Sequence, residues 1–168
     1  YFTTDVIDKY PNKSWNWEKL SKHHNIKLDD IKNHMDWPWV WKYGSIFSNP
    51  NLTYEWLSVC PNKKDGLNYL INHENFTVDL LKKYPDEDWN WEMLSEKSFI
   101  TLEILKLFPN KSWIWGDSDE LWCDSISNNK NLTIEWITTL PNKPWDYERI
   151  SYNPKLTLEW LEKFPNKN

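Results

Sequence analysis

The residue types that most often carry chemistry are few in this chain and are scattered along it. They are the histidines and cysteines His23, His24, His34, His73, Cys60 and Cys123. A zinc site needs His, Cys or carboxylate ligands that converge at short, defined spacings, and this set shows no such spacing. Two cysteines are also too few for a disulfide framework. The sequence therefore predicts no metal site, and we interpret the histidines as surface or helix-end residues.

Catalytic motifs are equally scarce. The chain has only 3 glycines, and they form no glycine-rich phosphate loop. It contains no H-E-x-x-H motif and no recognisable pairing of a nucleophile with a base. The carboxylates near the tryptophans lie where the first turn of a helix is expected, so their positions need no catalytic explanation. The sequence predicts a protein that is not an enzyme and that carries no cofactor.

Tryptophan is the unusual component, at 14 of 168 residues. A regular row of Trp rings could stack on bases, one per repeat, or on glycans. The net charge is −5 and Arg149 is the single arginine, which disfavours phosphate binding. Nucleic-acid binding by an aromatic ladder therefore stays the alternative hypothesis, with glycan binding behind it. No apolar stretch approaches the roughly 20 residues that cross a bilayer, so we expect no membrane association.

One short acidic stretch could contact a partner. Its sequence is GDSDELWC, residues 116–123. The candidate contact residues are Asp117, Asp119, Glu120, Leu121 and Trp122. In one interpretation the stretch is a solvated loop whose Trp122 packs on the core. In the other, Trp122 anchors a partner and the acids select a basic surface.

These residues are set in a sequence that repeats. PNKSWNWEKLS at residues 11–21 returns as PDEDWNWEMLS at 85–95, PNKSWIW at 109–115 and PNKPWDYERIS at 141–151. The step is 24 residues, lengthened by eight where residues 116–123 are inserted. A threonine and, eight residues later, a proline mark the repeats: Thr53, Thr77, Thr101, Thr133 and Thr157, with Pro61, Pro85, Pro109 and Pro141. A fixed period between 20 and 50 residues is typical of solenoids, propellers or arrays.

Helix-forming chemistry accounts for the recurring positions. The Thr is expected to be an N-cap whose hydroxyl accepts a hydrogen bond from a first-turn amide. An acid two residues later lies near the positive end of the helix dipole, and apolar residues on either side have the spacing of a hydrophobic staple. The Pro must end this first helix. The Asn or Asp directly after the Pro is expected to cap a second helix.

The second helix carries paired aromatic positions, which we expect to fill the space between neighbouring repeats. They are Trp15, Trp17, Trp89, Trp91, Trp113, Trp115 and Trp145. Helices this short are not stable alone, so the repeats must stack. The sequence predicts an all-α fold, an α-solenoid of tandem helix-turn-helix repeats of about 24 residues. The units are 2–27, 28–51, 52–75, 76–99, 100–131 with the insertion 116–123, 132–155 and a partial unit 156–168.

Units such as PNKPWDYERISYNPKLTLEW, which begins at Pro141, resemble the Trp-rich helical repeats of proteins from giant, AT-rich DNA viruses of amoebae. The likeness covers nearly the whole chain. The second unit departs from it most, and the third keeps PNK but has Asp65 and Leu67 in place of both tryptophans. That family is largely without assigned activity, so the resemblance implies an origin and a fold. It favours the virion or the infected host-cell cytoplasm as the location.

A solenoid without catalytic motifs most often binds other proteins. We therefore expect a protein-binding or structural scaffold module whose partner is a protein, or further subunits or repeats. The sequence stops at FPNKN, where a second helix would begin, and we expect further repeats or a capping unit there.

Overall fold

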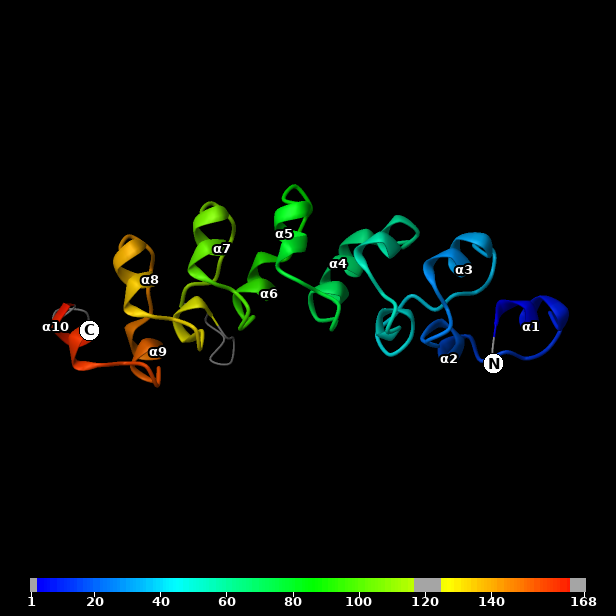
Figure 1. Ribbon diagram of the computed structural model, residues 1–168, viewed down its shortest axis with the longest axis horizontal. Helices are drawn as coiled ribbons and strands as arrows, with labels where there is room; N and C mark the ends of the chain where they lie inside the picture. Colours follow the sequence, from blue (N-terminus) through cyan, green and yellow to red (C-terminus); the bar gives the residue numbers. More distant parts are fainter. Residues whose placement is uncertain (1–2, 117–124, 164–168) are drawn as a thin grey trace. The chain divides into compact units, whose positions relative to one another are not determined.

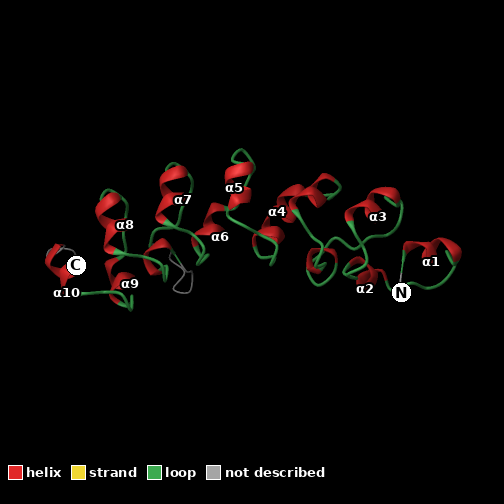
Figure 2. Cartoon of the chain, in the orientation of Figure 1, coloured by secondary structure: helices red, strands yellow, loops and turns green. Residues whose placement is uncertain are grey.

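The computed structural model describes residues 3–116 and 125–163, and every regular element within these ranges is a helix. Short helices alternate with turns, and the described ranges contain no strand (Figures 1 and 2). The predicted all-α class is therefore confirmed. The chain divides into two compact units, Tyr1–Trp89 and Asn90–Asn168, and each is described by itself.

The helices are short in both compact units. Those of the first are α1 (Thr4–Lys9), α2 (Trp17–Ser21), α3 (Leu28–Asn33), the 3-10 helices η1 (Ile46–Ser48) and η2 (Tyr54–Ser58), α4 (Lys63–Ile71) and α5 (Asp79–Lys83). Those of the second are α6 (Trp91–Ser95), α7 (Leu102–Leu107), the 3-10 helix η3 (Ile126–Asn128), α8 (Ile134–Thr139), α9 (Tyr147–Ser151) and α10 (Leu158–Lys163). Helices of five or six residues depend on packing for their stability.

The threonines stand at helix starts, but their hydroxyls do not cap the helices as expected. The N-cap threonines are Thr3, Thr53, Thr101 and Thr133, and none of these side chains binds a first-turn amide. The expected hydroxyl cap is therefore wrong. The hydroxyl has a competing partner in the carboxylate two residues later: Thr3 Oγ1 donates to Asp5 Oδ2 at 3.5 Å, and the hydrogen bond from Thr53 lowers the pKa of Glu55. Thr77 precedes the N-cap of α5, which is Val78.

Proline ends the first helix of the repeats, as the sequence predicts. The C-cap residues that directly precede a proline are Tyr10, Tyr84, Phe108 and Leu140. Their φ angles lie between −121° and −131° and their ψ angles between 56° and 62°, outside the helical region. A residue before proline avoids the α conformation because the pyrrolidine ring would clash with it.

The second helix begins later than expected in three repeats. Its N-cap is the residue between the paired aromatic positions, namely Asn16, Asn90 and Asp146, and these side chains accept from the backbone amides of Lys19, Met93 and Arg149 at 2.9–3.0 Å. The expectation that the residue after Pro caps this helix is therefore wrong for these repeats. It is right for the third repeat, where Asn62 Oδ1 accepts from the Asp65 amide at 3.2 Å and α4 starts at Lys63.

The core is built from the apolar residues that flank the first helix of each repeat. Both partners of the expected staple are buried in three repeats: Leu52 with Leu57, Ile100 with Leu105, and Leu132 with Ile137. Each of these side chains is at most 5% exposed. Burial of this apolar surface, at about 25 cal/mol per Å², holds helices that are too short to persist alone.

Candidate interaction surface

The first tryptophan of each pair closes the end of the preceding helix. Its indole N–H donates to the backbone carbonyl five residues earlier, at 2.8–3.1 Å. The pairs are Trp15 with Tyr10, Trp39 with His34, Trp89 with Tyr84, Trp113 with Phe108, and Trp145 with Leu140. The last carbonyls of a helix have no partner within the helix, so the indole satisfies one of them. This explains why the position is Trp and not another large apolar residue.

The second tryptophan of one repeat packs against the first tryptophan of the next. The pairs are Trp17 with Trp39, Trp91 with Trp113, and Trp115 with Trp145. Their ring centroids lie 5.0–5.5 Å apart and their planes cross at 74–87°, an edge-to-face arrangement. Such pairs contribute about 0.5–1.5 kcal/mol beyond the area they bury. The paired aromatics therefore form the joints between repeats.

Most of these rings are shielded from solvent. Trp89, Trp91, Trp113, Trp115 and Trp145 are between 2% and 8% exposed, whereas Trp15 and Trp17 are half-buried. The lysine of the P-N-K motif also covers the second ring of the preceding repeat. Lys111 Nζ lies 5.2 Å from the Trp91 ring centroid, and Lys143 Nζ lies 5.2 Å from that of Trp115.

A buried serine also joins neighbouring repeats. Ser21 and Ser95 are the last residues of α2 and α6, Ser127 lies within η3, and each is at most 1% exposed. Their hydroxyls accept from the backbone amides of Val40, Ile114 and Asp146, each 19 residues later, at 2.9–3.0 Å. They donate to the carbonyls of Trp17, Trp91 and Trp115. The last of these spans 12 residues where the other two span four, so eight extra residues lie between Trp115 and Ser127.

Asparagine side chains also join neighbouring repeats, through hydrogen bonds to backbone carbonyls. Asn51 Nδ2 donates to the carbonyls of His24 and Ile26, and Asn75 Nδ2 donates to those of Pro50 and Leu52, at 2.6–2.9 Å. In the other compact unit, Asn131 Nδ2 donates to the Ser98 carbonyl. These are the N-L-T and N-F-T strings of the repeat, so their Asn side chains are engaged between repeats.

The third repeat replaces the aromatic joint with a polar cluster. Glu87 accepts hydrogen bonds from Lys63 Nζ, at 2.6 Å, and from the Tyr54 hydroxyl. These bonds, that of Lys63 first, lower the pKa of Glu87, while burial and the bond to Glu87 raise the pKa of Tyr54. The Tyr54 ring stacks on Tyr84 with centroids 3.6 Å apart. The Tyr54 hydroxyl and the Glu87 carboxylate are hydrogen-bonded to each other. Neither is therefore a free base, and we interpret the cluster as structural.

The predicted partner-contact residues, Asp117, Asp119, Glu120, Leu121 and Trp122, lie outside the described residues. The residues on either side of the insertion are joined by backbone hydrogen bonds. The Ile126 amide donates to the Ile114 carbonyl at 2.9 Å, and the Ser127 amide donates to the Trp115 carbonyl at 3.1 Å. The insertion therefore leaves the repeat and returns to it at one place.

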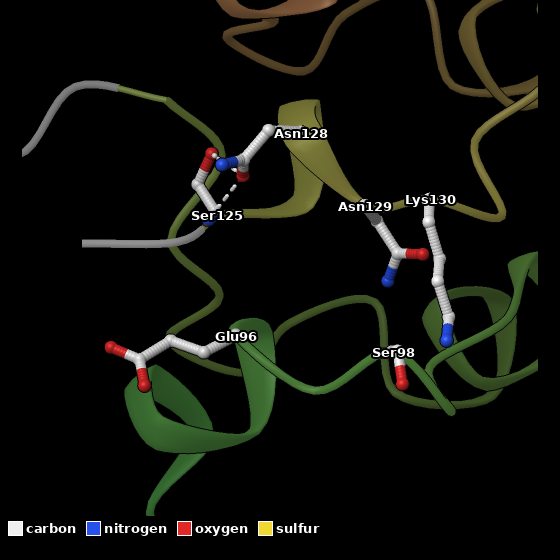
Figure 3. A pocket seen from close by; sticks show the side chains of 6 residues that line it. All are labelled: Glu96, Ser98, Ser125, Asn128, Asn129 and Lys130. Atoms are coloured by element: carbon white, nitrogen blue, oxygen red, sulfur yellow. Dashed lines mark hydrogen bonds between the residues drawn. The ribbon is translucent and has the colours of Figure 1, made fainter. Parts of the chain in front are cut away.

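A polar pocket of about 140 Å³ lies beside this place of return (Figure 3). It is lined by Glu96, Ser98, Ser125, Asn128, Asn129 and Lys130, from the end of α6 and from η3 with its flanks. Ser125 donates to Asn128 Oδ1 through its amide, at 2.6 Å, and Asn129 Nδ2 donates to the Lys97 carbonyl at 3.2 Å. The exposed acid and the exposed lysine are charges of opposite sign on one rim, which suits a polar protein surface.

The groups most often used as metal ligands or reactive nucleophiles were located among the described residues. These residues contain no group of three or more His, Cys, Asp or Glu side chains that could hold a metal ion. Cys60 is half-buried, its Sγ contacts the Asn62 carbonyl at 3.1 Å, and burial raises the pKa of its thiol, which disfavours the reactive thiolate. None of the described helices has the length and apolar character needed to cross a membrane.

Compared with known proteins, the chain matches no family model, no curated protein and no solved structure.

Sequence reasoning assigned the tryptophans to the joints but missed the polar residues that share this role. The buried serines were visible as the L-S or I-S in the second helix of four repeats, and the asparagines as the recurring N-x-T. Their recurrence at one place in the repeat was the available signal. It was attributed to helix ends and not to bonds between repeats.

Proposed function

We propose that this chain is a non-enzymatic protein-binding or scaffold module, built as an α-solenoid of tandem repeats of about 24 residues. The observation that carries this proposal is the spacing of two ion pairs. Lys63 pairs with Glu87 at 2.6 Å and Lys64 with Asp88 at 3.3 Å, so each pair joins equivalent positions 24 residues apart. Side-by-side equivalent positions are the signature of a repeat stack, and stacks present extended surfaces to partners.

Acidic side chains recur on the exposed surface of the repeats. The acids in the first turn of the first helices are all exposed, namely Asp5, Glu55, Asp79, Glu103, Glu135 and Glu159. Together with the net charge of −5, this favours a partner with a basic surface. The insertion and the polar pocket beside it are the contact region that we propose.

The shielding of the Trp rings favours a protein partner over nucleic acid. Stacking on a base or a sugar requires an exposed ring face. Trp113 and Trp145 are 6% and 8% exposed, and Lys111 and Lys143 lie over the rings of Trp91 and Trp115. The viral origin, and a place in the virion or the infected cytoplasm, stay proposals that rest on the resemblance of the repeats.

A photo-crosslinking experiment tests the proposed contact region. A photoreactive phenylalanine analogue is placed at Lys130, on the pocket, and in a matched variant at Lys106, which is exposed in the same compact unit but does not line the pocket. In a lysate of the producing cells, we expect a single protein adduct from position 130, insensitive to nuclease, and none from position 106. Equal adducts from both positions, or an adduct that nuclease removes, would contradict the proposal.

Deletion of residues 116–123 tests the insertion separately. The deletion joins Trp115 to Asp124 and restores the 24-residue step, so the chain should fold as judged by its helical far-UV spectrum and by cooperative unfolding. The adduct from position 130 should then be lost. A deletion variant that folds and still gives the adduct would show that the insertion does not bind the partner. Unfolding would assign Trp122 to the core.

A further inference from the structure

The joints between repeats use two residue types at one position, one or two residues after the end of the second helix. At this position a side-chain atom accepts a hydrogen bond from the backbone amide two residues later, at 2.8–3.1 Å. The acceptors are Asn49, Asn129 and Asn153 in three repeats, and His23 and His73 in two others. The side-chain oxygen of Asn and the unprotonated nitrogen of a neutral imidazole can both accept this hydrogen bond. Only the imidazole can be protonated.

The contacts of His73 require the neutral ring. Its Nδ1 accepts from the Asn75 amide at 3.1 Å, and its Nε2 lies 3.1 Å from the Asn49 carbonyl oxygen. A backbone amide can only donate and a carbonyl can only accept, so the single ring proton is on Nε2. Among the described residues, the groups that bind this ring are these two neutral backbone groups. A second proton on the ring would occupy Nδ1, and the resulting N–H would face the N–H of Asn75.

The turn at His73 supports the next joint. Asn75, whose amide His73 holds, donates through its side chain to the carbonyls of Pro50 and Leu52, both at 2.8 Å. His73 itself reaches the preceding repeat at Asn49. Opening this turn therefore removes bonds that join the second and third repeats.

His23 has the same acceptor role and a second histidine as its neighbour. Its Nδ1 accepts from the Asn25 amide at 3.1 Å, and its ring stacks on His24 with centroids 4.5 Å apart. Burial first, and then repulsion by His24, hold the pKa of His23 below its ordinary value. Its carbonyl accepts from Asn49 Nδ2 at 3.2 Å, which ties this turn also to the next repeat.

The histidine at position 34 has the opposite chemistry. His34 Nε2 lies 3.4 Å from Asp8 Oδ2, and Nδ1 lies 2.8 Å from the Asp30 carbonyl oxygen. Both partners are acceptors, so a protonated ring would gain a bond there. His34 therefore makes no hydrogen bond in which a ring nitrogen must accept, and it is not part of the proposed device.

We propose that the joints among the first three repeats form a pH-sensitive device, in which a second proton on the His73 or His23 ring removes the acceptor at Nδ1 and opens the turn. The Asn-based joints of the second compact unit do not respond. For His23, whose pKa is lower in the folded chain than in the unfolded chain, this contribution to stability is complete above the ordinary histidine pKa of about 6.5. It is lost as the pH falls below that value.

Amide hydrogen exchange of the full chain, followed by NMR at pH 7.5 and 5.0, tests this proposal. After correction for intrinsic exchange, protection of the Asn75 and Asn25 amides should fall about 5- to 10-fold at pH 5.0, as expected for loss of one hydrogen bond. Protection of the Asn51 and Asn131 amides should not change. Unchanged protection at Asn75 and Asn25 would overturn the proposal.

Two variants and one spectrum complete the test. The double variant His23→Asn, His73→Asn carries the residue that the other repeats use, so it should fold and lose the pH response, whereas His24→Asn should keep it. A double variant that keeps the response would refute the assignment to these rings. The ring nitrogen shifts of His73 at pH 7.5 should show the proton on Nε2, and a proton on Nδ1 would exclude the proposed switch.

Discussion

In the third repeat, residues 52–75, the chain enters its second helix directly after Asn62, whereas in the first, fourth and sixth repeats it first makes a turn of four residues. The turn is present where a Trp indole binds the carbonyl at the end of the preceding helix, as Trp15 binds Tyr10. The third repeat has Asp65 at that place and no indole to hold a turn. Its second helix, α4, accordingly extends over nine residues.

Gly66 shows how this longer helix fits. It stands where the other repeats have the N-cap Asn16, Asn90 or Asp146. A Cβ at Gly66 would lie 2.5 Å from Leu57 Cδ2 and 3.1 Å from Cys60 Sγ, so a larger residue there would require the Leu57 side chain to move. The comparison shows that four features of the joint differ together in the third repeat. These are the turn, the N-cap, the aromatic pair and the buried serine.

The first prediction concerns the aromatic joint, where the largest effect is expected. Trp145→Ala should lower the free energy of unfolding by about 3–5 kcal/mol, because it leaves a cavity and removes the edge-to-face partner of Trp115. Trp15→Ala, at a half-buried ring, should cost clearly less. Urea unfolding of both variants measures the difference, and equal small losses at the two positions would show that the rings are not joints.

The second prediction separates the indole N–H from the ring. Trp113→Phe keeps an aromatic ring but leaves the Phe108 carbonyl without its donor, at a cost of about 1–3 kcal/mol. In the third repeat the equivalent change, Asp65→Ala, removes no such bond and should cost less than about 1 kcal/mol. Thermal unfolding measures both changes. A Trp113→Phe variant as stable as the wild type would show that the indole N–H does not stabilise the fold.

The third prediction tests which asparagine caps a helix. Asn62→Ala should cost about 1 kcal/mol, because Asn62 Oδ1 accepts from the Asp65 amide at the start of α4. Asn12 holds the same place after Pro11 but lies in the turn before α2, so Asn12→Ala should be within about 0.5 kcal/mol of the wild type. Matching losses in urea unfolding would mean that the two repeats do not differ as described.

The smallest effect is expected at the recurring threonine. Thr133→Ala should cost only a few tenths of a kcal/mol, because the hydroxyl makes no bond to a first-turn amide. A loss near 1 kcal/mol in thermal unfolding would restore the hydroxyl cap that the sequence suggested.

The sequence predicts the helical class and the apolar joints because both depend on period and residue type. Proline stops and buried staple residues such as Leu52 and Leu57 follow from local rules. The positions of the N-caps do not follow from local rules, because Asn12 and Asn16 are equally good N-cap residues. The choice between them depends on the hydrogen bond from the Trp15 indole to the Tyr10 carbonyl. That bond is set by packing.

The polar pocket and the serine bonds between repeats were less predictable still. The buried Ser95 reaches an amide 19 residues away, and the polar pocket is assembled from Glu96 and Lys130, which no local pattern connects. Contacts over such separations depend on how repeats stack. Only a recurring residue type, such as the final serine of the repeat, signals them in one sequence.

The charge pair between Lys63 and Glu87 tests the central claim, that equivalent positions of consecutive repeats lie side by side, most directly. Lys63→Glu and Glu87→Lys each place two like charges together, and each should lower the free energy of unfolding. The double exchange should recover a coupling of about 0.5–1 kcal/mol, as for a partly exposed ion pair. Strictly additive losses in this double-mutant cycle would show that the two positions do not meet, and would contradict the stacked arrangement.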